Sequence, residues 1–184
     1  MALEDNFTKE IILQSQIEQL KIKQMETIKT IEEIEKQLKA PMNYKWRIQS
    51  INEYKATCVA YVDARDVMDR LDEVFGVNGW EDYYYESDGK LFCKLSCHFP
   101  DKQWAITKSD TGSESNVEKD KGLASDTFKR AAVKFGVGRF LYSLGIEDLK
   151  VKKHTNGKNY PADDKGNILW STADLNAYIS RKNK

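Results

Sequence analysis

The sequence predicts an α+β domain, in which helices cover an antiparallel sheet. Three observations predict it. Apolar residues recur at helical spacing after Asp63, residues 90–99 alternate between apolar and polar, and the Asp-Gly pair at 88–89 is a strong hairpin signal. The expected core is a strand, a helix, a three-stranded antiparallel sheet and a second helix. An N-terminal heptad helix precedes this core, and a small C-terminal hairpin and helix follow it.

The composition is that of a globular protein. The chain has 184 residues, enough for one domain with a core and an appendage. Apolar residues make up 40% and charged residues 32%, which excludes a wholly disordered chain. No apolar run is long enough to cross a bilayer, and the acids Glu4 and Asp5 argue against a secretory signal peptide. We therefore expect no membrane contact and a cytoplasmic location.

Residues 1–40 form the first predicted region, a helical, coiled-coil-like arm that ends before Pro41. No Gly or Pro interrupts residues 8–40, and six of the eight positions in a heptad seam are apolar. The narrow stripe favours self-association, and the alternative is an amphipathic helix that covers its own domain. The seam positions are Leu13, Ile17, Leu20, Gln24, Thr27, Ile31, Ile34 and Leu38.

Residues 41–150 form the predicted core domain, whose elements follow from alternation, helical spacing and turn residues. Asp63 is the expected N-cap of the first helix, which ends at Gly76. Gly136 and Gly138 are expected to disturb the second helix. The expected elements are strands at 56–62, 80–86, 90–99 and 103–108, helices at 64–75 and 122–144, and a polar surface loop at 110–121.

Residues 151–184 form a basic C-terminal extension with seven cations and three acids. Turn signals at 156–157 and 165–167 predict a hairpin, and a small helix is expected over residues 172–180.

The cysteines predict neither a disulfide nor a metal site. Cys93 and Cys97 lie four residues apart on an expected strand, about 13 Å from each other, which is too far for a disulfide. The histidines His98 and His154 do not supply the partners that a zinc site needs. We expect these cysteines and Cys58 to be buried reduced thiols.

The formal net charge is zero, yet the cations are concentrated in parts of the chain. Residues 127–146 contain Lys129, Arg130, Lys134 and Arg139 and no acid. Because salt screens charges beyond about 8–10 Å, such segregation can create a basic groove on a neutral protein. Arg130 and Lys134 repel each other at i and i+4 unless an anionic ligand or an acid from elsewhere in the fold lies beside them. Both arrangements, and plain solvation, remain open at this point.

The strand at 90–99 is a second candidate site. Its polar face presents Lys90, Phe92 and Lys94, and cations interleaved with an aromatic ring suit a surface that follows a phosphate backbone while bases stack. An ordinary solvated sheet face fits the same pattern.

The sequence contains no phosphate-binding loop and no nucleophile with a matching base, so we expect no enzyme. Asp110, Glu114 and Glu118 could be imagined as ligands of a metal-dependent nuclease, but solvated acids are expected in such a polar segment.

Two strings resemble the single-strand annealing proteins, namely the Sak-type phage recombinases and the larger Rad-fifty-two superfamily of double-strand break repair proteins. They are YVDARDVMDRLDEVFGVNGWEDYYYE at 61–86 and KGLASDTFKRAAVKFGVGRFLYSLG at 121–145, and the likeness covers residues 44–150. It implies subunits that assemble side by side into rings or helical arrays. Single-stranded DNA would lie in a continuous positive groove with its bases turned outward, and no nucleotide cofactor would be used.

The resemblance also implies DNA contacts at particular positions. The basic pair of the long helix falls on Lys129 and Arg130, whereas the next basic position falls on Val133, with Lys134 beside it. Further matching positions are Arg47, ahead of the first expected strand, Lys90 and Lys121. Lys94 and Arg139 complete the predicted DNA-binding set on charge alone.

We therefore expect an ATP-independent protein that anneals complementary single strands as a homo-oligomer, encoded by a phage or prophage of a bacterial host. A partner exonuclease and the host's single-strand binding protein are candidate helpers. The main alternative is a coiled-coil scaffold or adaptor that binds other proteins, and a metal-dependent nuclease is a third reading.

Overall fold

A computed structural model describes residues 13–19, 29–112 and 119–183 of the chain. Residues 13–19 are helical. The further helices are α2 (Ile31–Lys39), α3 (Ala64–Phe75), α4 (Lys119–Phe135), the 3-10 helix η1 (Arg139–Ser143) and α5 (Thr172–Lys182). The strands are β1 (Lys45–Ile51), β2 (Ala56–Tyr61), β3 (Trp80–Ser87), β4 (Lys90–Cys97), β5 (Ile106–Thr111), β6 (Ile146–Lys153) and β7 (Asn159–Ala162).

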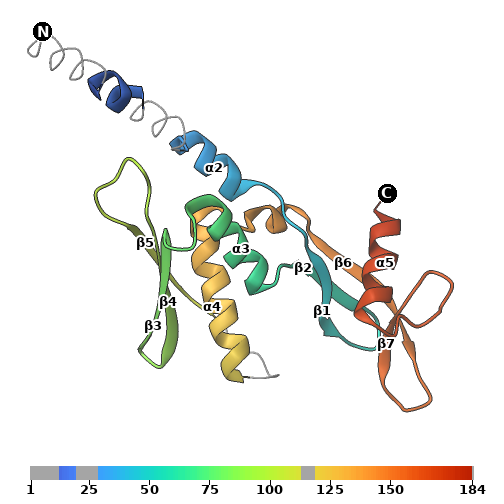
Figure 1. The fold of residues 1–184 in the computed structure, drawn as a ribbon. Helices are drawn as coiled ribbons and strands as arrows, with labels where there is room; N and C mark the ends of the chain where they lie inside the picture. The colour runs from blue at the N-terminus through green and yellow to red at the C-terminus, as the bar shows by residue number, and fades with distance from the viewer. Residues whose placement is uncertain (1–12, 20–28, 113–118, 184) are drawn as a thin grey trace, which may run out of the picture.

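The strands form two antiparallel sheets rather than the single sheet that we expected. One sheet has the order β1-β2-β6-β7 and the other the order β3-β4-β5. Figure 1 shows α3 and α4 between the two sheets and α5 on the opposite side of the four-stranded sheet. The predicted α+β class is confirmed, and the predicted order of core elements holds within the three-stranded sheet and its helices.

The central core lies where α3 and α4 meet the three-stranded sheet. Val67 and Leu71 of α3, Leu95 of β4 and Phe128 of α4 are all buried there. Helix α3 begins, as predicted, at the N-cap Asp63, whose backbone N–H donates to the Asp66 carboxylate. A second core joins α5 to the four-stranded sheet.

Local turn chemistry explains why the β3–β4 hairpin was predictable. Asp88 and Gly89 have φ values of 51° and 70°, the left-handed pair that a type I′ turn requires. The turn fixes a register in which Tyr83 lies opposite Lys94 and Tyr85 lies opposite Phe92. Strand β4 buries Cys93, Leu95 and Cys97, as the predicted alternation requires, and it also buries Ser96 of the opposite face.

Two predicted elements have boundaries that differ clearly from those observed. The strand expected at 103–108 begins at Ile106 and continues to Thr111, so Asp110 belongs to β5 and not to a surface loop. The helix expected at 122–144 ends at Phe135, because Gly136 and Gly138 have φ values of 115° and 71° that no helix accommodates. The chain then continues as the 3-10 helix η1.

The C-terminal hairpin and helix form as predicted, but they complete a sheet that begins at β1. Strand β6 pairs with β2, and α5 packs on β1. The predicted boundary at residue 150 falls inside β6, and β1 itself, which contains Arg47, was not expected as a strand.

The arm divides into two parts with different surroundings. The N-cap of α2 is Thr30, which forms a capping box with Glu33, and the seam residues Ile34 and Leu38 of this helix are each only 1% exposed. This half of the seam covers its own domain, as the alternative interpretation held. Leu13 and Ile17 are 56% and 43% exposed, whereas the seam positions Leu20, Gln24 and Thr27 lie outside the described residues.

The three cysteines are free and buried, as predicted. Burial raises the pKa of Cys97 to about 12 and those of Cys58 and Cys93 to about 11, so all three are held as neutral thiols. Among the residues that the structure describes, no helix is long and apolar enough to cross a membrane.

Candidate nucleic-acid interface

Three of the predicted DNA-binding residues meet in one groove. Arg47 of β1 and Lys129 and Arg130 of α4 line a cavity of about 630 Å³ between the four-stranded sheet and α4. Tyr61 of β2 and Ile146 of β6 also line it. Arg47 and Lys129 are more than 80 residues apart in the sequence, and the fold brings these cations of a strand and a helix to one concave surface.

Lys129 is the most enclosed of the three cations. Its Nζ donates a hydrogen bond of 3.4 Å to the backbone oxygen of Val62. Burial and, secondarily, the positive charge of Arg47 lower the pKa of Lys129, although Asp126 and Asp63 oppose this shift. An anion placed in the groove would offset both causes, so the electrostatics of Lys129 favour a negatively charged ligand.

Arg47 contacts an aromatic side chain that sequence reasoning missed. The Arg47 guanidinium lies 5.3 Å from the ring centroid of Tyr61, in cation–π geometry. Tyr61 also lines the adjoining cavity of about 290 Å³, together with Arg47 and Lys129. Tyr61 is the first residue of the string at 61–86 that resembles the annealing proteins. Only the β1–β2 pairing shows that its ring lies against an arginine.

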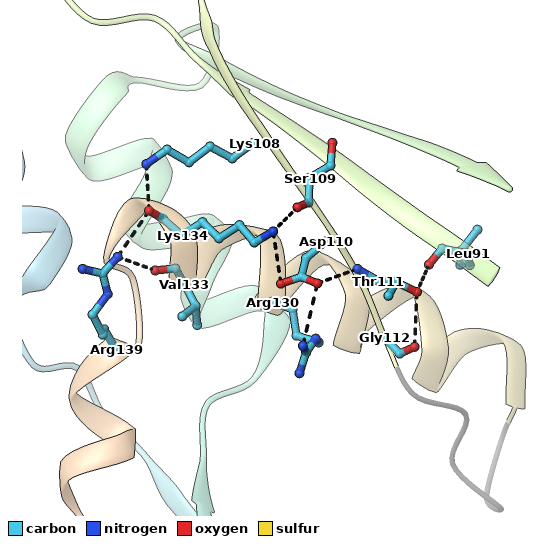
Figure 2. Close-up of polar contacts among 10 residues, drawn as sticks. All are labelled: Leu91, Lys108, Ser109, Asp110, Thr111, Gly112, Arg130, Val133, Lys134 and Arg139. Carbon is cyan, nitrogen blue, oxygen red and sulfur yellow. Dashed lines mark hydrogen bonds and ion pairs between the residues drawn. The ribbon is translucent and has the colours of Figure 1, made fainter. Parts of the chain in front are cut away.

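Arg130 and Lys134 share an acid from another element, as one of the open readings held. The carboxylate of Asp110 lies 3.7 Å from Arg130 Nη2 and 3.5 Å from Lys134 Nζ (Figure 2). Lys134 also donates to the backbone oxygen of Ser109. Because Lys134 is directed toward β5, it does not line the groove that Arg130 lines.

Arg139 lies at the C-terminal end of α4 rather than in the groove. Its guanidinium donates to the backbone oxygens of Val133 and Lys134 at 2.9 and 3.2 Å, and Lys108 donates to that of Lys134 at 2.8 Å (Figure 2). Cations bound to the last carbonyls of a helix stabilise its end. The turn at Gly136 and η1 bring Arg139 back to α4, a placement that a continuous helix could not have given.

Lys90 and Lys94 lie on yet another surface. Both are exposed on the face of the three-stranded sheet that points away from α4. Between them Phe92 stacks on Tyr85, with ring centroids 5.3 Å apart and an interplanar angle of 16°, and Tyr85 stacks in turn on Tyr83. The polar face of this strand and the basic helix therefore do not line one cleft, since β4 presents its other face to α4.

The remaining predicted residues are only partly described. Lys121 belongs to the first turns of α4, but its side chain lies outside the described part of the structure. Glu114 and Glu118 also fall outside the described residues, and Asp110 is engaged by two cations. Across the described ranges, no cluster of three or more metal-ligating side chains occurs.

Comparison with known proteins identifies similar sequences. Residues 16–91 match the model of the Rad52/22 family double-strand break repair protein. The chain is also similar to the single-stranded DNA-binding protein DdrA of Deinococcus radiodurans, with 32% identity over 126 residues, and to that of Deinococcus deserti, with 30% identity over 121 residues. These matches cover 62% of this chain and 57% and 59% of the two relatives, so the chain spans less than two thirds of their length.

The family match has a different extent from the likeness noted in the sequence. It begins at residue 16, inside the arm that we had placed outside the likeness, and ends at Leu91. Arg47 and Tyr61 lie within it, whereas α4 with Lys129 and Arg130 lies beyond its end. The predicted resemblance is confirmed for the first of the two strings.

Proposed function

We propose that this chain belongs to the Rad52 superfamily, and that it binds single-stranded DNA and anneals complementary strands in DNA repair, without ATP. The match to the Rad52/22 family over residues 16–91 and the similarity to two single-stranded DNA-binding proteins support this proposal. The observation that supports the proposal most strongly is the groove in which Arg47, Lys129 and Arg130 converge. Its cations suit a phosphate backbone, whose contacts give affinity without reading sequence.

Annealing sets a second requirement, which is that the bases stay accessible. A groove that holds DNA by its phosphates leaves the base edges free for a complementary strand. The lowered pKa of Lys129 also supports backbone binding, because a phosphate would compensate the charge of this partly buried ammonium and an uncharged base would not. The bound strand would therefore be held with its backbone toward α4.

The groove of one chain is short, so we propose that neighbouring subunits extend it in a homo-oligomer, either a ring or a helical array. The exposed seam residues Leu13 and Ile17 are suited to contacts between chains. A role in phage or prophage recombination, with a partner exonuclease and the host's single-strand binding protein, belongs to the same proposal.

The other predicted cations are expected to contribute less to DNA binding. Lys90 and Lys94 lie on the outer sheet face, and Lys134 and Arg139 make internal contacts beside α4. If they touch DNA, they do so outside the groove, and their substitution should weaken binding less than substitution of Lys129 and Arg130.

A salt titration of binding to a fluorescent oligothymidylate tests the proposed function. We expect log K to fall linearly with log salt, by about 0.7 per neutralised phosphate, and two complementary oligonucleotides to anneal faster with the protein and without ATP. The absence of binding at low salt would favour the adaptor alternative. Degradation of the oligonucleotide on adding magnesium would instead support a nuclease.

A further inference from the structure

The sheet wall of the groove continues beyond it, across β6 to β7. Ile146, which lines the groove, lies opposite Val59 of β2, another groove residue. Side chains alternate along a strand, so Lys150 and Lys152 share the face of Ile146. Tyr160 of β7 lies directly opposite Lys152 and therefore belongs to this face as well.

Three aromatic rings gather at the far end of this face. Trp170 lies with its ring centroid 5.0 Å from that of Tyr160 and 5.2 Å from that of His154, and the latter two are 5.9 Å apart. The side-chain amide of Asn156 donates to the Tyr160 hydroxyl at 2.9 Å and so orients that ring. Trp170 nevertheless remains 60% exposed, which is unusual for a large ring that already has two aromatic neighbours.

The charge along this path is positive. Lys150 and Lys152 are both exposed, and Lys152 donates to the backbone oxygen of Gly166. The acid between them and the groove, Asp148, accepts from Lys55 at 2.6 Å and from Thr57 at 2.8 Å, which lowers its pKa. Because Lys55 neutralises this carboxylate, Lys150 and Lys152 determine the local charge that a phosphate on this surface would experience.

We propose that Lys150, Lys152, Tyr160 and Trp170, which we call the β6–β7 platform, form a second contact surface for single-stranded DNA. The exposed ring of Trp170 stacks on an unpaired base, and the two lysines contact the flanking phosphates. Only a single strand offers an unstacked base to such a ring, so duplex DNA gains little here. The inference rests on the proposed function, since it extends the path of the same strand along the same sheet face.

Binding of oligothymidylates of increasing length tests this platform. Trp170→Ala should weaken the affinity for long oligonucleotides by at least about fivefold and leave short ones unaffected, whereas Trp170→Phe should retain most of the affinity. Trp104→Ala is the matched control, because Trp104 is 69% exposed in the segment between β4 and β5, and it should bind like the wild type.

A second variant covers the case in which Trp170→Ala does not fold. Lys150→Ala with Lys152→Ala changes two exposed side chains and should reduce the slope of log K against log salt by about 1.4. Wild-type affinity and slope in both folded variants would overturn the platform. Loss of binding in Lys129→Ala with Arg130→Ala would then still support the groove as the DNA-binding site. A wild-type chain that binds no oligonucleotide would overturn the proposed function together with the platform.

Discussion

The carboxylate of Asp110 lies 3.7 Å from the guanidinium of Arg130 (Figure 2). The same carboxylate lies 3.5 Å from Lys134, so one acid of β5 partly balances two cations of α4. An anionic ligand of Arg130 has to compete with this internal partner. If the groove binds DNA as proposed, Asp110 limits its attraction for phosphate, and removal of this carboxylate should change the binding affinity.

Asp110→Asn should strengthen binding of single-stranded DNA. The amide keeps the shape of the carboxylate but frees the charges of Arg130 and Lys134, and partly exposed ion pairs of this kind are worth roughly 0.2–1 kcal/mol. We expect an affinity gain of up to about fivefold at low salt, measured by fluorescence anisotropy. Unchanged or weaker binding in a folded variant would mean that neither cation reaches the DNA.

Lys129→Ala with Arg130→Ala should weaken binding of single-stranded DNA while leaving the fold and the assembly intact. The loss of two phosphate contacts should lower the salt slope by about 1.4. The matched control is Lys36→Ala with Lys102→Ala, which removes the same charge from exposed positions outside the groove. Equal affinities for the two double variants would remove Lys129 and Arg130 from the site.

As the pH rises, the affinity for DNA should begin to decline at a lower pH than the titration of an ordinary lysine would cause. Burial and Arg47 lower the pKa of Lys129 from its usual 10.5, so the free protein loses this charge as the pH rises through the lowered value. A bound phosphate favours the protonated form, and affinity therefore falls over that range. The measurement is binding to an oligodeoxyadenylate between neutral pH and pH about 10 at constant ionic strength.

Lys129→Arg is the control for this pH profile. An arginine stays charged throughout the range, so its affinity should remain nearly constant where that of the wild type declines. Parallel profiles for both proteins would assign the decline to other groups.

The two halves of the arm should respond differently to alanine substitution. Ile34→Ala or Leu38→Ala should lower the free energy of unfolding by about 2–5 kcal/mol, because both side chains are buried in the core, whereas Leu13→Ala and Ile17→Ala should leave it unchanged. Denaturant titration measures both effects. If residues 13–19 mediate self-association, the latter pair should also lower the mass determined by light scattering.

Elements with strong local signals were predictable from the sequence. Asp63 and Gly76 delimit α3, and the left-handed pair Asp88 and Gly89 sets the β3–β4 hairpin, because capping and turn geometry depend on neighbours along the chain. Strand β1 was not recognised, because only one of its seven residues is buried and no alternation marks it. The pairing of β6 with β2 was not expected either, because these two strands are distant in sequence.

The predicted site residues lie on different surfaces for the same reason. Lys129 and Arg130 lie next to each other on α4, and their basic helix was evident from composition alone. Whether Lys90, Lys134 or Arg139 joins them depends on which way a strand or helix faces and on where α4 ends. Those orientations arise from packing against other elements, and so the sequence grouped cations that the fold directs to three different surfaces.

Residue order alone was enough to predict the α+β class, the main helices and the hairpin, the buried thiols and the concentration of cations on α4, because each follows from periodicity, capping or residue chemistry within a short stretch of chain. The packing of distant elements was needed to show that Arg47 lies near Lys129 beside Tyr61, that Asp110 pairs with Arg130, and that β6 and β7 extend the sheet wall of the groove. These contacts join strands and helices across long sequence separations, where registers and faces are selected by burial of the two cores.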